Sequence, residues 1–419
     1  MSDTSSPLKT TPKLEELTGR WLLLMIAGVV CLSIALVLGL FQGDSLSYFY
    51  HSYLTSFSFF LSIALGALFF VTVSHLVRMG WGVVFRRLSE CMAASVWIFI
   101  PLFLVILLPM LLPLIGMGEM KVAYALFPWN APELDDLTLH KTPYLNPGFF
   151  AIRAVVYFAV WIWLSRYFFT KSLKQDENGN KDLTIQMQSF SAPAMYLIGL
   201  TYTFASFDWL MSLDPHWFST IFGVYFLAGA ACAFFSAMII LSYLLQKRGL
   251  LKEAVNVEHF HDLGKLLFGF VCFWGYIAFS QFLLIWYANI PEETVWYLPR
   301  FEGPWFGLSF VLIFGHFVIP FLGLLSRKAK RVVPILFLWA IYMLVMHFAD
   351  IFWLVMPQYY HGSAVEPAEI GIPFGVIDLL CILGVGGLYM GAFLKTVGAH
   401  SIVAIHDPRL DESLAFKNT

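Results

Sequence analysis

Ionisable side chains interrupt several of the most apolar stretches of this sequence. Asp208 lies in one stretch, Arg153 in another, and His347 and Asp350 in a third. The last two are three residues apart, so a helix would place them on one face. Ionisable groups inside a membrane are costly and mark proton relays, substrate paths or buried ion pairs. We hypothesise that Asp208, His347 and Asp350 form a protonatable cluster tuned by Arg153; the alternative is an ion pair that only holds helices together.

Four further side chains are candidates for a proton path. His316 lies in the middle of another apolar stretch, Tyr276 lies on a neighbouring one, and His75 and Glu90 lie near the ends of theirs. Histidine changes its charge near neutral pH, which suits a relay. For His75 and Glu90, and also for Asp378, we expect an interfacial position near lipid headgroups. No residue is predicted to be catalytic.

Two histidines at similar depth raise the alternative of a haem. His316 and His347 could ligate a b-type haem through both imidazoles, but Phe317, Phe348 and Met346 crowd the site. The five cysteines form no Cys-x-x-Cys or Cys-x-x-Cys-His pattern, so they do not indicate an iron–sulfur cluster, a c-type haem or structural zinc. We therefore expect this chain to bind no haem or metal of its own.

The composition is that of a membrane protein. Hydrophobic residues make up 59% of the chain and charged residues only 12%, which excludes an ordinary soluble domain. Stretches of about 20 apolar residues can cross a bilayer as helices. We predict one all-α membrane domain over residues 20–397, with ten spans. These are 20–41, 48–76, 90–115, 148–169, 191–213, 216–245, 264–290, 304–326, 332–356 and 373–397.

The positions of the basic residues predict the orientation. With ten spans, every Lys and Arg falls on one side of the membrane except Lys121, Lys141, Arg153 and Arg300. Cytoplasmic loops carry the excess of basic residues, so both tails, 1–19 and 398–419, are predicted to be cytoplasmic. The long loop 116–147 then lies outside, either as a docking surface or as a solvated connector. The inner loop 171–182 reads as a polar turn. Spans 2–5 and 6–9 could form two four-helix bundles, flanked by spans 1 and 10.

Several segments resemble a known family. They are DWLMSLDPHWFST at 208–220, LGALFFV at 65–71, GWGVVFRR at 80–87, KTPYLNPGFF at 141–150 and QDENGN at 175–180. Together they resemble the NrfD/PsrC-like membrane subunits, and most closely the ActF type of the bacterial alternative complex III, a quinol:cytochrome c oxidoreductase. The sister ActC type shares the ten-helix plan.

The resemblance implies a place in the bacterial inner membrane within a respiratory complex. Its partners would be a sister NrfD-like subunit, an iron–sulfur/molybdopterin-like subunit and multihaem cytochrome c subunits, and these would carry the haems and clusters. The chain itself would anchor the redox subunits and contribute a proton-conducting path or an environment for quinol. In the family the better-supported quinol site lies in the sister subunit, and the resemblance assigns no quinone-binding residues here.

Two other functions fit a membrane protein of this size. One is a purely structural scaffold of the same complex. The other is a stand-alone secondary transporter, which would need a substrate site at mid-membrane formed by broken helices. The prolines Pro101, Pro109 and Pro113 lie on one span only, so the matched pattern of two broken helices is missing.

Overall fold

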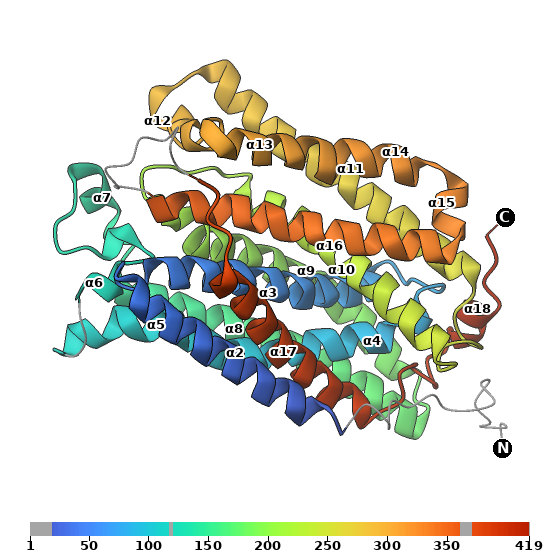
Figure 1. Cartoon of the computed structure of the whole chain (residues 1–419). Coiled ribbons are helices and arrows are strands. Elements are labelled where there is room, and N and C mark those ends of the chain that lie inside the picture. The colour runs from blue at the N-terminus through green and yellow to red at the C-terminus, as the bar shows by residue number, and fades with distance from the viewer. Residues whose placement is uncertain (1–18, 117–119, 361–370, 419) are drawn as a thin grey trace.

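The computed structural model describes residues 19–116, 120–360 and 371–418, and within these ranges it contains helices and no strand. The predicted N-terminal tail lies almost wholly outside the described residues. The long helices run side by side (Figure 1). They are α2 (Trp21–Gln42), α3 (Ser47–Leu76), α4 (Val83–Ala94) with α5 (Phe99–Leu111), α8 (Pro147–Asn178), α9 (Asp182–Trp209), α10 (Phe222–Lys247), α11 (Val257–Ala288), α13 (Gly303–Val311) with α14 (Ile319–Leu325), α16 (Val333–Val355) and α17 (Val376–Gly398).

Short helices lie at the two ends of the long ones. One end carries α6 (Met120–Ala123), α7 (Asp136–Lys141) and α12 (Pro291–Thr294), and the other carries α15 (Arg327–Arg331) and α18 (Leu410–Leu414) (Figure 1). A short 3₁₀ turn, η1 (Ser95–Ile98), joins α4 to α5, and a π-helical turn, η6 (Leu312–Val318), joins α13 to α14.

Nine helical segments among the described residues are long and apolar enough to cross a membrane, which makes this a multi-pass membrane protein. Nine of the ten predicted spans correspond to these segments. The remaining predicted span, the fifth in order, at 191–213, lies within α9, which is not among the nine segments. Serines, threonines, glutamines and Asp208 are spread along it, so it has no sufficiently apolar stretch of the length that a membrane span needs.

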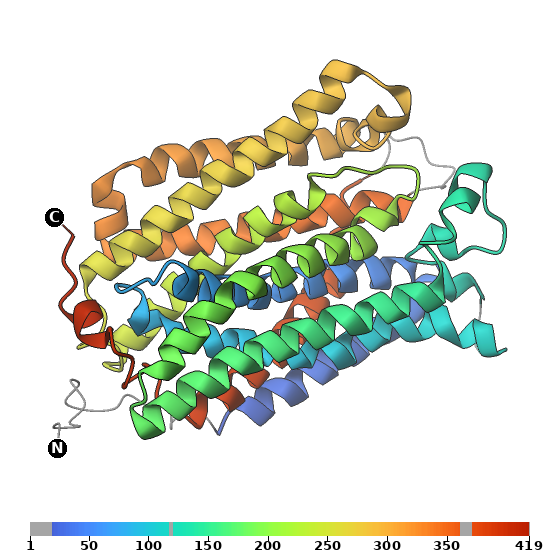
Figure 2. The same cartoon turned by 180° about the vertical axis from the view of Figure 1, so that it is seen from behind.

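Helix α9 nevertheless runs along the whole length of α8 (Figure 2). At one end the Gln175 side chain of α8 donates to the Thr184 hydroxyl of α9 over 2.7 Å. At the other end Arg153 of α8 meets Asp208 of α9. With 28 residues, α9 is about 42 Å long at 1.5 Å per residue, which exceeds the thickness of a bilayer core.

Two predicted segments are corrected by the helix bounds. The span predicted at 148–169 continues as α8 to Asn178, so most of the predicted polar turn at 171–182 is helical. The span predicted at 264–290 begins earlier, at Val257, because the Asn256 side chain accepts hydrogen bonds from two backbone N–H groups of the first turn. Polar residues at a helix end carry no apolar signal, so hydropathy alone placed both ends too close to the centre.

The first and last helices form a tight pair. An added Cβ at Gly28 of α2 would lie 2.7 Å from the carbonyl oxygen of Gly384 of α17, so only glycine allows this approach. The Lys395 ammonium lies 4.9 Å from the centre of the Trp21 ring. The start of α2 and the end of α17 are therefore at the same end of the molecule.

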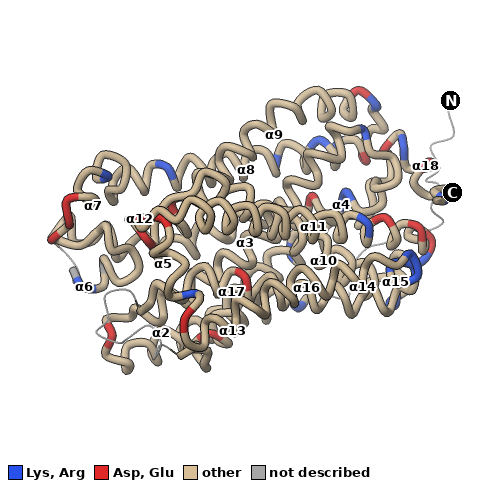
Figure 3. The backbone as a smooth tube through the Cα atoms, turned by 90° about the horizontal axis from the view of Figure 1, so that it is seen from above, with Lys and Arg blue, Asp and Glu red and all other residues tan. Residues whose placement is uncertain are grey.

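Helix α3 is the most buried of the nine segments and lies at the centre of the molecule. It packs against α4, α9, α10, α16 and α17, while α10 also packs against α9, α11 and α16. Lys and Arg gather at the end of the molecule that carries α15 and α18, and fewer lie at the end with α6, α7 and α12 (Figure 3).

Candidate functional site

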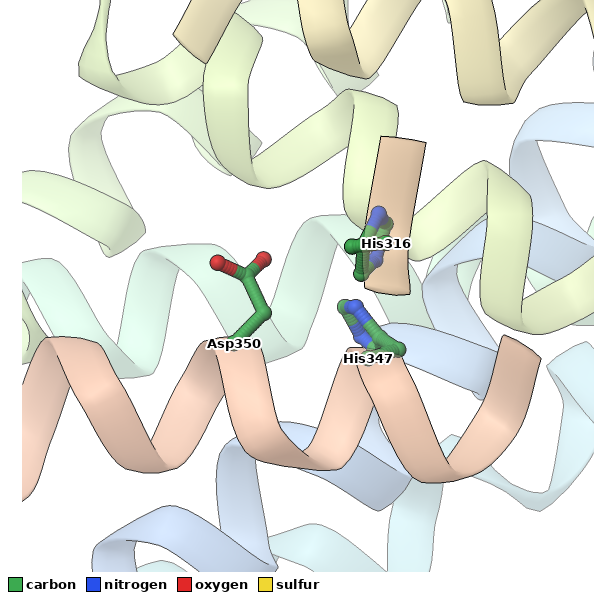
Figure 4. A group of neighbouring side chains, drawn as sticks. All are labelled: His316, His347 and Asp350. Carbon is green, nitrogen blue, oxygen red and sulfur yellow. The ribbon is translucent and has the colours of Figure 1, made fainter. Parts of the chain in front are cut away.

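Three ionisable side chains meet inside the helix bundle. His347 and Asp350 project from α16, and His316 projects from the π-helical turn η6 beside it (Figure 4). One potential ligand atom from each of the three lies within 4.8 Å of the others. All three side chains are buried. We call these residues the central group.

Hydrogen bonds from three other helices position the central group. The Tyr225 hydroxyl of α10 donates to one oxygen of Asp350, and the Trp274 indole N–H of α11 donates to the other over 3.1 Å. Ser62 of α3 lies 2.9 Å from His347 Nε2. Among the described residues, no Lys or Arg is ion-paired with Asp350.

The bonds of Ser62 assign the proton on His347. The Ser62 hydroxyl donates to the carbonyl oxygen of Phe59 over 2.7 Å, so its oxygen is left to accept from His347 Nε2–H. His347 Nδ1 is then an acceptor, and it is buried with no hydrogen-bond partner among the described residues. Both ring nitrogens of His316 are buried and unpartnered as well. The central group therefore has three nitrogen atoms that could take part in proton exchange.

Helix α10 approaches the central group closely at Gly229. A Cβ added at Gly229 would lie 2.8 Å from His347 Cε1 and 3.0 Å from His347 Nδ1, so a larger residue would press on the imidazole. The π-helical turn carries His316 toward α16, and such turns are frequent at functional sites. The Trp274 ring packs on His316 with 3.9 Å between ring centres.

Asp208 and Arg153 form a separate pair near the end of the molecule that carries α7, the end predicted to face outward. We call it the outer pair. Arg153 makes two hydrogen bonds to the Asp208 carboxylate, of 2.7 and 2.9 Å, and Tyr157 donates a third of 2.7 Å. Among the described residues, no hydrogen bond or ion pair joins Asp208 to His347 or Asp350. The hypothesised cluster is therefore divided: the histidine and aspartate of α16 come together as expected, while Asp208 lies elsewhere with Arg153.

His75 and Glu90 are buried among the helices rather than exposed at the surface. Glu90 accepts from Arg87 over 3.1 Å, and Arg87 also pairs with Asp176 over 2.7 Å. His75 stacks on Phe168, with ring centres 5.4 Å apart. Its two ring nitrogens have no partner among the described residues. The predicted polar turn thus supplies Asp176 to a buried charge network near the end of the molecule that carries α18.

Neither Tyr276 nor Asp378 belongs to the buried groups described above. Tyr276 is 65% exposed on the outside of α11 and belongs to none of the three buried groups. Asp378 is buried rather than interfacial, and it accepts from the backbone N–H of Gly375, from Ser52 and from Tyr48 at the start of α17. These bonds explain Asp378 as a helix cap that joins α17 to α3.

The described part of the loop predicted at 116–147 packs onto the corner between α9 and α10. The Trp129 indole donates to Ser212 over 3.2 Å, and Lys141 donates to the carbonyl oxygen of Pro215 over 2.5 Å. Asp135 lies 3.0 Å from His216. Hydrogen bonds from Thr138 and then from His216 lower the pKa of Asp135 to about 2. The loop is therefore fixed to the corner rather than a free connector.

Several residues of the site carry no signal in the sequence. Ser62, Tyr225 and Trp274 lie on three different helices, and each is of a type common in membrane helices. Only the packing of those helices brings them to His347 and Asp350. The i, i+3 spacing of the α16 pair was the one local clue.

Comparison with known proteins adds no identification. No family model matches the chain, and no curated protein was found that is similar to it.

Proposed function

We propose that this chain is an integral membrane subunit of a respiratory quinol:cytochrome c oxidoreductase complex, where it anchors the redox subunits and contributes part of a proton-conducting path. The proposal is supported by the segments that resemble the NrfD/PsrC-like subunits and by the buried protonatable groups. The chain is an accessory subunit and holds no haem or metal in this proposal. Haems and iron–sulfur clusters belong to its partners, a sister NrfD-like subunit, an iron–sulfur/molybdopterin-like subunit and multihaem cytochromes.

The membrane arrangement proposed with this function has ten crossings, with α9 as the additional one. Contacts of α9 with α8 at both ends support this count. Two four-helix units follow from it: α3, α4 with α5, α8 and α9 form one, and α10, α11, α13 with α14, and α16 form the other. The basic end of the molecule then faces the cytoplasm of a bacterial cell, with both termini inside.

The observation that carries the proton path is the central group. A buried carboxylate without a cation is costly when ionised. Asp350 must therefore hold a proton itself or share one with the adjacent imidazoles of His347 and His316. Since one potential ligand atom from each of the three lies within 4.8 Å of the others, a proton can have more than one resting place here. A group of this kind suits a relay station.

Two other buried groups extend the proposed path toward the ends. Glu90 and His75 lie at the inner end, and Asp208 with Arg153 lies at the outer end. The scaffold alternative explains the outer pair well, because Arg153 neutralises Asp208 in place. It gives no account of the unpartnered nitrogens of His316 and His347. The transporter alternative would need a matched pair of broken helices. The two interrupted spans, α4 with α5 and α13 with α14, are the second helix of one four-helix unit and the third of the other, so they do not match.

The test is the variant Asp350→Asn in the purified complex, reconstituted in vesicles. The amide keeps the shape of the side chain but cannot exchange a proton. Because one carboxylate oxygen is replaced by an NH2 group, one of the two donors, Tyr225 or Trp274, loses its acceptor. We expect a stability loss of about 1–3 kcal/mol, an assembled complex, and a clear fall in protons released per electron. The matched control is Asp182→Asn, an exposed aspartate in the first turn of α9. A wild-type proton-to-electron ratio in Asp350→Asn would rule out the relay and leave the scaffold.

A further inference from the structure

A cavity of about 380 Å³ lies beside the central group, between α11, η6 and the adjoining faces of α10 and α16. Its walls are mainly aromatic and aliphatic. They include Trp274, Ala278, Phe282, Phe317 and Trp353. The volume lies within the range of small-molecule sites, and such sites are typically apolar with a few polar groups that orient the ligand.

Polar side chains lie at two places in the cavity wall. Tyr225 and Trp274 line it, and both donate to Asp350. Gln281 and Tyr297 line it too, with the Gln281 amide 3.3 Å from the Tyr297 hydroxyl. A ligand in the cavity would therefore contact two residues that bond to the central group, and a second pair of hydrogen-bonding residues in the wall.

The cavity borders the lipid-facing surface of the molecule. Phe279 and Ile313 both line it and are 60% and 47% exposed. Both belong to segments that can cross a membrane. A lipid-soluble ligand could therefore enter sideways from the bilayer without passing through water.

We propose that this cavity binds the ring of an isoprenoid quinone or quinol, with its tail in the lipid. A flat ring fits between Trp274, Phe282 and Phe317, because aromatic rings stack favourably when offset. The carbonyl oxygens of a quinone accept hydrogen bonds, and the Tyr297 hydroxyl in the cavity wall, which accepts from Gln281, is a donor. A phospholipid acyl chain would use the apolar walls alone and would accept no hydrogen bond from the Tyr297 hydroxyl. The proposal rests on the proposed function for its ligand class, and it places a quinone in this chain and not only in a sister subunit.

The experiment uses the purified complex and a short-tailed benzoquinone that carries a photoactivatable azido group. We expect the probe to label peptides that contain residues 275–282 or 309–318, and unlabelled decylubiquinone to compete. Ala278→Phe should weaken labelling at least tenfold, because the new ring fills the cavity. The matched control is Ala192→Phe on the exposed face of α9, which should label like the wild type.

Two results would overturn the proposal. One is labelling of these peptides that Ala278→Phe leaves unchanged. The other is equal competition by a dioleoyl phospholipid, which would assign the cavity to an acyl chain. If Ala278→Phe disturbs folding, Ala278→Leu provides a smaller obstruction and should weaken labelling to a lesser degree. Probe binding that persists in Asp350→Asn separates this site from the relay: the cavity can bind a quinone even if the proton ratio of that variant is normal.

Discussion

The outer pair and the central group both bury a carboxylate, yet they neutralise it in different ways. Asp208 is held by two hydrogen bonds from Arg153, whose charge cannot be removed at physiological pH. Asp350 has only the neutral donors Tyr225 and Trp274, with His347 and His316 nearby. The first carboxylate is compensated by a fixed cation, and the second depends on protons that can move.

This difference separates structural from functional charges in a membrane protein. An arginine–carboxylate pair holds two helices together, here α8 and α9, and gives a proton no reason to leave or arrive. A carboxylate beside imidazoles can share a proton with them, which is what a relay requires. The comparison therefore moves the centre of the proposed path from Asp208 to Asp350.

The largest expected effect is on the outer pair. Arg153→Met leaves Asp208 buried without its cation, and breaking such a pair typically costs about 3–5 kcal/mol. We expect a lower yield of assembled complex and a lower unfolding temperature, with turnover per assembled complex retained. Thermal unfolding and the yield after purification measure this. Arg166→Met, at an exposed position of the same helix, is the control and should behave like the wild type.

One result would contradict the distinction between the outer pair and the central group. Normal yield of Arg153→Met together with a loss of proton release would show that the outer pair is part of the relay. Asp208 would then belong with Asp350, as the sequence alone suggested.

A smaller effect is expected from Ser62→Ala. His347 loses the oxygen that accepts from Nε2–H, so its proton is no longer fixed on that nitrogen. We expect a loss of about 1 kcal/mol in stability and a shifted pH profile of proton release, with assembly intact. A merely structural serine would leave the pH profile unchanged. Ser74→Ala is the control, because Ser74 is buried on the same helix and its hydroxyl donates only to the backbone oxygen of Val71.

The sequence predicted the helices well and the sites only in part. Long apolar stretches identify spans because their signal is local, and nine of the ten were recovered. Spacing on one helix also predicted that His347 and Asp350 would share a face. The partners of Asp350 could not be predicted, because Tyr225 and Trp274 come from other helices. For the same reason the sequence could not show that Arg87 and Asp176 join Glu90.

The smallest expected effect tests the fixed loop that carries α7. The folded-state pKa of Asp135 is lowered to about 2 by hydrogen bonds from Thr138 and His216, so the ionised form is favoured in the folded protein. Its contribution is present above the ordinary aspartate pKa of about 4 and is lost as pH falls toward about 2. Asp135→Asn removes it at all pH values. We expect hydrogen exchange in residues 135–145 to rise roughly two- to fivefold at pH 6, since an exposed pair contributes little. Acidification should bring the exchange rates of the wild type toward those of the variant between about pH 4 and about pH 2.

Asp136→Asn, the neighbouring exposed aspartate, is the control. Equal exchange in wild type and Asp135→Asn at pH 6 would show that Trp129 and Lys141 hold the loop without help from the ion pair.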